Sequence, residues 1–288
     1  MSYNRRTFLK NSALLSSGLV LSGASLVSCN TGSGHHDFGL QLYSLRDDLP
    51  KDPKGVLKQV STFGYKQVEG YEGPMGMFWN MKHTEFKKYM DDLGMNMVSS
   101  HCDWQKDLEA KAAQAGEIGM KYLICPYLGT QDNIDAFKAF AAKFNEAGEI
   151  CKKHGLRFAY HNHDYSFKPV NGQLPQDVLI AETDANLVDF EMDMYWVVDA
   201  GVDPVVYLEK HKDRFKLCHV KDRLKVADPN AGNNSCTLGE GSIDYPSILK
   251  KAKDNGVSYF IVEQELYNNT TPLKSAADNA AYMNKLGI

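Results

Sequence analysis

Four short apolar runs in this sequence each end in a side chain that can bind a metal ion. The four residues are His161, Asp193, His219 and Glu263. Imidazole nitrogens and carboxylate oxygens together suit Mn, Zn, Co or Fe. The structural alternatives are a turn cap for Asp193 and a core imidazole for His219. We predict that the four residues hold one divalent metal ion, provided that the fold brings the ends of these runs together.

Two of these positions have a rival close by in the sequence. His163 follows His161 by two residues, so both side chains point to the same side of an extended strand. His163 could be the ligand instead, or a catalytic or hydrogen-bonding partner of the substrate. Glu265 competes with Glu263 in the same way.

Other polar residues at the ends of such runs are candidates for substrate contacts. We expect Glu69 and His101 to line a substrate cavity, although they could instead make structural hydrogen bonds there. Trp196 could stack on a sugar face or serve only in packing. Lys221 could neutralise an oxyanion as a catalytic residue or pair with Asp222.

The elements that must position these residues alternate along the chain. Apolar runs of strand length follow a glycine or a charged turn, and helical stretches separate them. Strands that alternate with helices indicate βαβ units, and eight such units in about 250 residues indicate an α/β fold, the (β/α)8 TIM barrel. An open doubly wound sheet is the alternative, but no GxGxxG follows the first strand. The expected strands are Phe38–Tyr43, Tyr65–Glu69, Met95–His101, Met120–Cys125, Leu156–His161, Leu187–Asp193, Phe215–His219 and Val257–Glu263.

A barrel places chemistry at the carboxyl ends of its strands, which is where the candidate residues stand. The stretch 221–244 is too long for a simple loop, so we expect it to fold over this end of the barrel. The clearest expected helices are Lys51–Phe63, Phe137–His154, Pro204–His211 and Tyr245–Asn255.

Composition and charge narrow the range of functions. The chain has 288 residues, is 43% hydrophobic and carries a formal net charge of −4. An acidic chain without a Lys/Arg run is a poor nucleic-acid binder. No CxxC motif is present, so a thiolate zinc site is not expected.

Residues 1–28 are interpreted as an export signal peptide. Arg5 and Arg6 precede a mildly apolar, Ser- and Gly-rich stretch. This segment resembles a twin-arginine signal, and Leu26–Cys29 resembles a lipobox, in which Cys29 would become a lipid anchor. An ordinary secretory signal is the alternative. We expect an exported, membrane-anchored protein with a tether over 29–37 and a barrel domain over 38–288, and the oligomeric state stays open.

Several motifs, taken together, resemble the sugar isomerase/epimerase superfamily of xylose isomerase-like or endonuclease-IV-like barrels. In its epimerases, Glu, Asp, His and Glu from strands five to eight hold one metal, and Asp193, His219 and Glu263 match the last three. His161 departs from the first, as in the branch that resembles inosose dehydratases. The motifs are Gly39–Arg46, Tyr160–Asp164, Met192–Trp196, His219–Asp222, Gly239–Gly241 and Val262–Gln264.

The resemblance implies a metal-dependent isomerase or epimerase acting on a sugar or keto-sugar. The ion would make the C–H bond beside a carbonyl acidic, and Glu263 would remove the proton, with His161 or His163 opposite it. The alternative outcome is β-elimination, as in a dehydratase or in a lyase or hydrolase that cleaves keto-glycosides. A phosphodiesterase like the DNA-repair members would need more histidines and a basic face. A non-catalytic sugar-binding lipoprotein is the remaining alternative.

Overall fold

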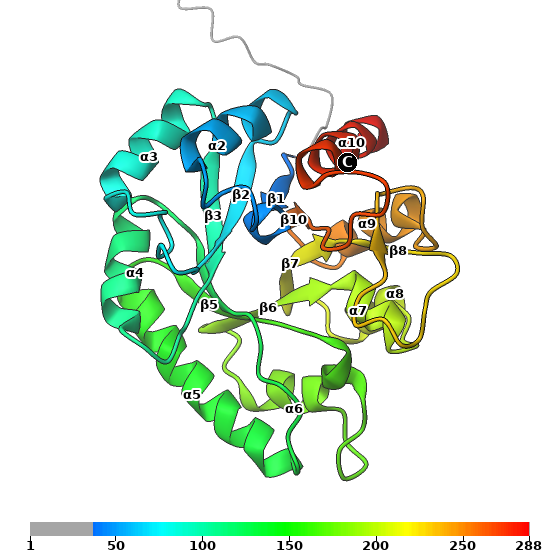
Figure 1. Cartoon of the computed structure of the whole chain (residues 1–288). Coiled ribbons are helices and arrows are strands. Elements are labelled where there is room, and N and C mark those ends of the chain that lie inside the picture. Colours follow the sequence, from blue (N-terminus) through cyan, green and yellow to red (C-terminus); the bar gives the residue numbers. More distant parts are fainter. Residues whose placement is uncertain (1–36, 288) are drawn as a thin grey trace, which may run out of the picture. The chain divides into compact units, whose positions relative to one another are not determined.

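The strands close into one barrel. The structure is a computed structural model that describes residues 37–287. Eight strands lie parallel in the cyclic order β1-β10-β7-β6-β5-β4-β3-β2. This arrangement confirms the predicted (β/α)8 barrel (Figure 1). The strands are β1 (Gly39–Gln41), β2 (Gln67–Tyr71), β3 (Asn96–His101), β4 (Tyr122–Cys125), β5 (Arg157–His161), β6 (Val188–Asp193), β7 (Phe215–Val220) and β10 (Tyr259–Val262).

Helices cover the outside of the barrel, and one side of each helix supplies the packing. In α5 (Ile134–Lys153), Phe137, Phe144 and Cys151 are buried on one face, and Phe144 packs against Phe158 of β5. The other helices are α2 (Pro53–Thr62), α3 (His83–Asp92), α4 (Leu108–Glu117), α6 (Pro175–Glu182), α7 (Met194–Asp199), α8 (Pro204–Lys210), α9 (Tyr245–Asp254) and α10 (Pro272–Leu286).

Strand β6 shows how the barrel interior is built. All six of its residues are buried. Its apolar side chains, Val188, Phe190 and Met192, alternate with Asp189, Glu191 and Asp193. Successive side chains point to opposite faces of a strand, so the three acids share the barrel interior. Near the start of the strand, Asp189 accepts hydrogen bonds from Arg157 and Tyr122.

The segment after β7 lies against the mouth of the barrel, as expected. It contains a short antiparallel pair, β8 (Asp222–Arg223) with β9 (Ser235–Cys236). Asp222 anchors the segment by accepting backbone N–H bonds from Gly239, Gly241 and Ile243. The Asn233 amide donates a hydrogen bond to Glu265 at the mouth.

The first strand is shorter than expected. Leu42–Leu45 form a 3₁₀ helix, η1, because the Gln41 side chain accepts the Tyr43 backbone N–H at 3.0 Å and caps this turn. A second short 3₁₀ helix, η2, covers Asp164–Phe167 after β5.

The predicted leader, the lipid anchor at Cys29 and nearly all of the tether lie outside the described residues. Within 37–287, no helix is long and apolar enough to cross a membrane. The five cysteines of this part are buried and free.

Candidate metal and substrate site

A cavity of about 490 Å³ opens at the carboxyl ends of the strands. That volume falls in the range of small-molecule sites. Tyr and Trp side chains share its walls with polar groups, several of which the sequence places at the strand ends. The lining includes Tyr43, Tyr71, His101, Trp104, Tyr127, His161, His163, Trp196, Lys221, Glu263 and Glu265.

Asp193, His219 and Glu263 gather beside this cavity from three consecutive strands of the barrel. His219 Nδ1 lies 3.2 Å from Glu263 Oε2 and 3.8 Å from Asp193 Oδ2. His161 Nε2 approaches the same Asp193 oxygen, also at 3.8 Å. The structure therefore brings three of the predicted ligands, Asp193, His219 and Glu263, into one group, and places His161 at the edge of that group.

The two oxygens of Asp193 differ in their surroundings. Oδ1 accepts the backbone N–H of Trp196 at 3.2 Å and caps α7. Oδ2 is buried and receives no hydrogen bond from residues 37–287. Asp193 therefore caps α7 with one oxygen and keeps the other oxygen facing the site, so capping and metal binding do not exclude each other.

The unpartnered oxygen indicates that these residues fit a divalent ion. Two atoms about 2.1 Å from the same ion lie about 3.0 to 3.5 Å apart. The distances from His219 Nδ1 to Glu263 Oε2, 3.2 Å, and to Asp193 Oδ2, 3.8 Å, are close to this spacing. A buried carboxylate oxygen without a hydrogen bond is costly unless a cation completes it, and the Lys221 ammonium stands 3.7 Å from Asp193 Oδ2.

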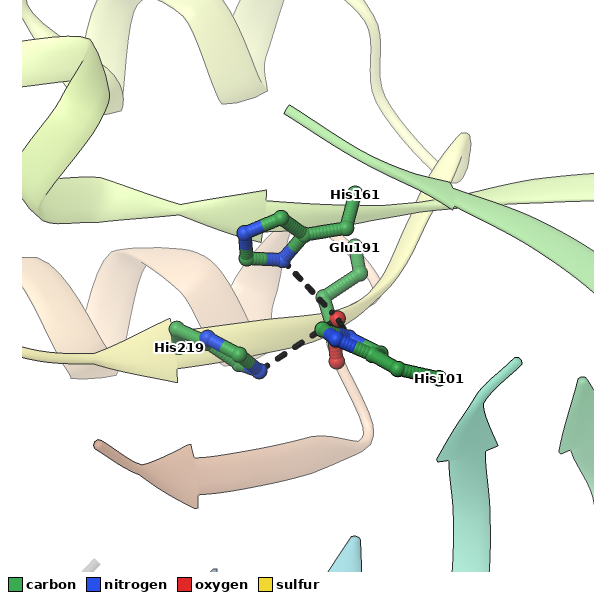
Figure 2. A group of neighbouring side chains, drawn as sticks. All are labelled: His101, His161, Glu191 and His219. Atoms are coloured by element: carbon green, nitrogen blue, oxygen red, sulfur yellow. Dashed lines mark hydrogen bonds and ion pairs between the residues drawn. The ribbon is translucent and has the colours of Figure 1, made fainter. Parts of the chain in front are cut away.

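A deeper layer of ionisable groups lies beneath these ligands. Figure 2 shows Glu191 between the imidazoles of His101, His161 and His219. Glu191 Oε2 lies 2.8 Å from His101 Nε2 and 3.0 Å from His161 Nδ1. Glu69 Oε1 lies 2.7 Å from His219 Nε2.

Lys221 stands between the ligands and the cavity. Its ammonium lies 3.2 Å from Glu263 Oε2 and also contacts Glu265. Burial opposes its charge, but Glu263, Asp193 and Glu265 outweigh burial and raise the pKa of Lys221. Lys221 pairs with these acids rather than with Asp222, whose carboxylate holds the mouth segment.

The two glutamates beside Lys221 have opposite proton affinities. Burial opposes the ionised form of Glu263, yet Lys221 and His219 lower its pKa. Burial raises the pKa of Glu265 despite the contact with Lys221. Two neighbouring carboxyl groups whose surroundings move their pKa values in opposite directions are a pattern of proton-transfer sites.

The pKa values in the deeper layer shift in different directions from one group to the next. Burial disfavours protonation of His101, but Glu69 and Glu191 outweigh burial and raise its pKa to about 9. Burial and the charge of Glu69 raise the pKa of Glu191 to about 7. Burial and the neighbouring His219 lower the pKa of His161, which keeps it neutral, the form that binds metals.

The remaining expected residues fall into two groups. His163 and Trp196 line the cavity with ring centroids 5.3 Å apart, and Lys221 Nζ lies 5.1 Å from the Trp196 ring centroid. Burial lowers the pKa of His163 to about 4, and no group in the described chain bonds its buried Nδ1. His101 also reaches the cavity. Glu69, expected to contact substrate, is fully buried and is not among the lining residues.

Glu191 is the residue that the sequence reasoning overlooked. It stands two positions before Asp193, so the alternation of β6 places both on the interior face. The Asp-x-Glu-x-Asp spacing of 189–193 was the available signal. Asn162 was also missed: its amide bridges β5 to β6 by bonding the backbone O and N–H of Asp193 at 3.2 and 3.1 Å.

The closed barrel of parallel strands, with candidate metal ligands at the carboxyl ends of the strands, is the feature by which this protein can be classified. The model of the Xylose isomerase-like TIM barrel family matches residues 57–286, and the chain belongs to this family. Among solved structures, it is similar to a sugar phosphate isomerase/epimerase from Parabacteroides distasonis. That match has 29% identity and a TM-score of 0.72, and it covers 91% of this chain and 97% of the other.

Curated relatives include an inosose dehydratase from Clostridium perfringens, 28% identical over 146 residues. The match covers 46% of this chain and 48% of the relative, so the chain spans about half the length of that relative. A structure of the IolI protein with a bound zinc atom shares the fold at 13% identity and a TM-score of 0.70, covering 87% of this chain and 97% of that one.

Proposed function

We propose that this protein is a metal-dependent lyase that removes the proton beside the carbonyl of a keto-sugar or keto-polyol and expels a β-oxygen. The observation that carries the proposal is the group of Asp193, His219 and Glu263 beside the cavity, with His161 3.8 Å from Asp193 and Lys221 at the edge of the group. A divalent ion bound there would polarise the carbonyl and an adjacent hydroxyl.

Glu263 is the proposed base. Its lowered pKa keeps the carboxylate ionised at neutral pH, so it can accept the proton from the carbon beside the carbonyl. The ammonium of Lys221 would stabilise the negative charge that develops on the substrate oxygen. Glu265, held by Lys221 and Asn233, faces the same cavity and is placed to protonate the departing oxygen.

The elimination balances without a further reactant. The electron pair of the broken C–H bond forms a carbon–carbon double bond while the β-carbon–oxygen bond breaks. The oxygen leaves with one proton, as water from a hydroxyl or as an alcohol from a glycoside. Elimination needs a base on only one face of the carbon.

Replacement of the family's strand-five glutamate by His161 favours elimination over epimerisation. Epimerisation needs proton-transfer groups on both faces of the carbon, and that glutamate usually supplies one of them. The similarity to inosose dehydratases, whose name describes the loss of water from a keto-polyol, points the same way.

Isomerisation or epimerisation is the second candidate. The unpartnered Nδ1 of His163 favours it, because His163 lines the same cavity as Glu263 and could return a proton from another direction. The solved relative from Parabacteroides distasonis carries an isomerase/epimerase name.

One experiment separates these outcomes. The purified protein, with Mn²⁺ or Co²⁺ added, is incubated in D₂O with ketoses, keto-polyols and keto-glycosides, and the products are followed by NMR. A lyase gives an unsaturated product and free water or alcohol. An epimerase returns a saturated sugar deuterated beside the carbonyl. If no compound exchanges or reacts, proton abstraction is the wrong chemistry, and a sugar-binding role is favoured.

A further inference from the structure

We propose that Glu69 and Glu191 are positioning residues that hold the two metal-ligating imidazoles from beneath and direct their outer nitrogens at the ion. The inference rests on the proposed metal site. It assigns roles to a residue expected to bind substrate, Glu69, and to one that the sequence left unassigned, Glu191.

Distances distinguish the two sides of each imidazole: the side below, which faces Glu69 and Glu191, and the side above, which faces Asp193. Below, His219 Nε2 is 2.7 Å from Glu69 and His161 Nδ1 is 3.0 Å from Glu191, which are hydrogen-bond lengths. Above, His161 Nε2 and His219 Nδ1 each stand 3.8 Å from Asp193 Oδ2, which is too long for a hydrogen bond, and His219 Nδ1 also lies 3.2 Å from Glu263 Oε2, a longer contact than the one below and one to a proposed metal ligand. The ion therefore belongs above the imidazoles and the proton below them.

With an ion bound above the rings, this division would set the tautomer of each histidine. A proton on the lower nitrogen donates to a glutamate and leaves a lone pair on the upper nitrogen for the metal. Histidines that bind metals commonly donate their other N–H to a carboxylate, which orients the ring and raises its basicity. His161 and His219 would each be held this way by a different glutamate.

The glutamates are themselves fixed. Glu69 accepts hydrogen bonds from the Gln41 amide at 2.7 Å and the Ser99 hydroxyl at 2.6 Å. His101 joins the two acids, at 2.8 Å from Glu191 and 3.2 Å from Glu69. Both glutamates are fully buried. Neither can therefore turn toward solvent and release its imidazole.

Beside both glutamates the neighbouring strand carries one extra residue, Val98 in β3 and Lys216 in β7. The pairing of β2 with β3 shifts register between Val68 and Glu69, and that of β6 with β7 shifts between Phe190 and Glu191. Such irregularities re-aim side chains and are frequent near active sites. Here they coincide with the two carboxylates that meet the metal ligands.

The same cluster could be read as a second metal site, because its His and Glu atoms converge. The hydrogen-bond lengths within it argue against an inserted ion. One Glu191 oxygen, Oε1, has no partner in the described chain, so Glu191 is the less firmly held of the two acids. The number of ions bound per chain decides between these readings.

The test measures metal affinity rather than turnover. Mn²⁺ and Zn²⁺ binding to the full-length chain is titrated against a chromophoric chelator, and the visible spectrum of the Co²⁺-loaded protein is recorded. Glu69→Gln and Glu191→Gln should each weaken binding about 10- to 100-fold at one ion per chain and shift the Co²⁺ bands. Glu191→Leu, which removes the acceptor entirely, should weaken binding more than Glu191→Gln.

Asp189→Asn is the matched control. Asp189 is a buried acid on the same face of the same strand, but it bonds Arg157 and Tyr122 instead of the metal ligands. Asp189→Asn should lower the melting temperature and leave metal affinity and the Co²⁺ spectrum unchanged.

Three results would overturn the inference. Wild-type affinity and an unchanged spectrum in both Gln variants would mean that the glutamates only stabilise the fold, and the proposed function would stand. Two ions in the wild type that fall to one in Glu191→Gln would make the cluster a second metal site. A wild type that binds no ion would remove the proposed function and this inference together.

Discussion

We propose two tasks for the single carboxylate of Glu263, metal binding and proton abstraction. Its Oε2 faces His219 and Lys221, while its position on the cavity wall leaves it open to a substrate. Metal binding and proton abstraction can be separated at this residue, because a Gln side chain keeps the shape and one carbonyl oxygen but loses the basic oxygen.

We expect Glu263→Gln to retain metal, more weakly than the wild type, while turnover falls by about 10²- to 10⁴-fold. Solvent deuterium should enter the substrate in the wild type and not in this variant, as read by NMR. Near-normal exchange in Glu263→Gln, together with its loss in His161→Gln or His163→Gln, would make an imidazole the base.

His163 gives a prediction about pH. Its pKa falls from 6.5 to about 4 because it is buried. Between these values the unfolded chain binds a proton that the folded chain does not, so stability rises with pH. The contribution is present above pH 6.5 and is lost as the pH falls toward 4, reaching about 3 kcal/mol at most.

The measurement is urea unfolding of the chelator-treated protein at several pH values from 4 to 7, in the wild type and His163→Phe. Phe keeps a ring against Tyr127 and Trp196 but cannot titrate. The wild type should lose more stability than the variant over this interval. Parallel curves would show that His163 is protonated in both states or in neither.

At the scale of elements, the candidate site depends on how β5 and β6 are joined. Asn162, fully buried after the end of β5, bridges to the backbone of Asp193 with two hydrogen bonds. The bridge sets the height of Asp193 relative to His161, so it acts on both the stability of the fold and the geometry of the metal ligands.

Asn162→Ala should lower the free energy of unfolding by about 2 to 4 kcal/mol, since it leaves a buried backbone N–H and C=O unpaired. Metal affinity should fall with it. Asn145→Ala is the control, because Asn145 makes a similar amide bridge, to Glu182 and Asp184, at an exposed site. If both variants keep full metal affinity in a chelator titration, the bridge does not position Asp193.

The sequence predicts the helices and strands and the residues at the strand ends, because each of these features depends on neighbouring residues in the chain. Glycines after helices and apolar runs before polar residues predict the barrel, and strand ends predict His161, Asp193 and His219. Glu191 escaped because it lies inside a strand, whereas the candidates were taken from the strand ends, although alternation along β6 puts it on the same face as Asp193. Glu69 was expected at the mouth as the end of its strand, but β2 continues to Tyr71, so Glu69 lies deeper in the barrel.

At the scale of the whole molecule, the function of the barrel and the location of the protein depend on different parts of the chain, the barrel and the predicted leader. The barrel accounts for the site, whereas location rests on residues 1–29 of the sequence. We predict that Cys29→Ser moves the protein from the membrane fraction to the soluble exported fraction. Fractionation followed by immunoblotting measures this, and unchanged membrane association would contradict the lipid anchor.

The central claim is that the mouth of this barrel holds a divalent metal ion. Elemental analysis of the purified protein after incubation with Mn, Co, Zn or Fe and removal of free metal tests it most directly. We predict one ion per chain in the wild type and loss of most of it in Asp193→Ala and in His219→Ala. A wild-type protein that stays empty with every metal and shows no thermal shift on metal addition would contradict the account.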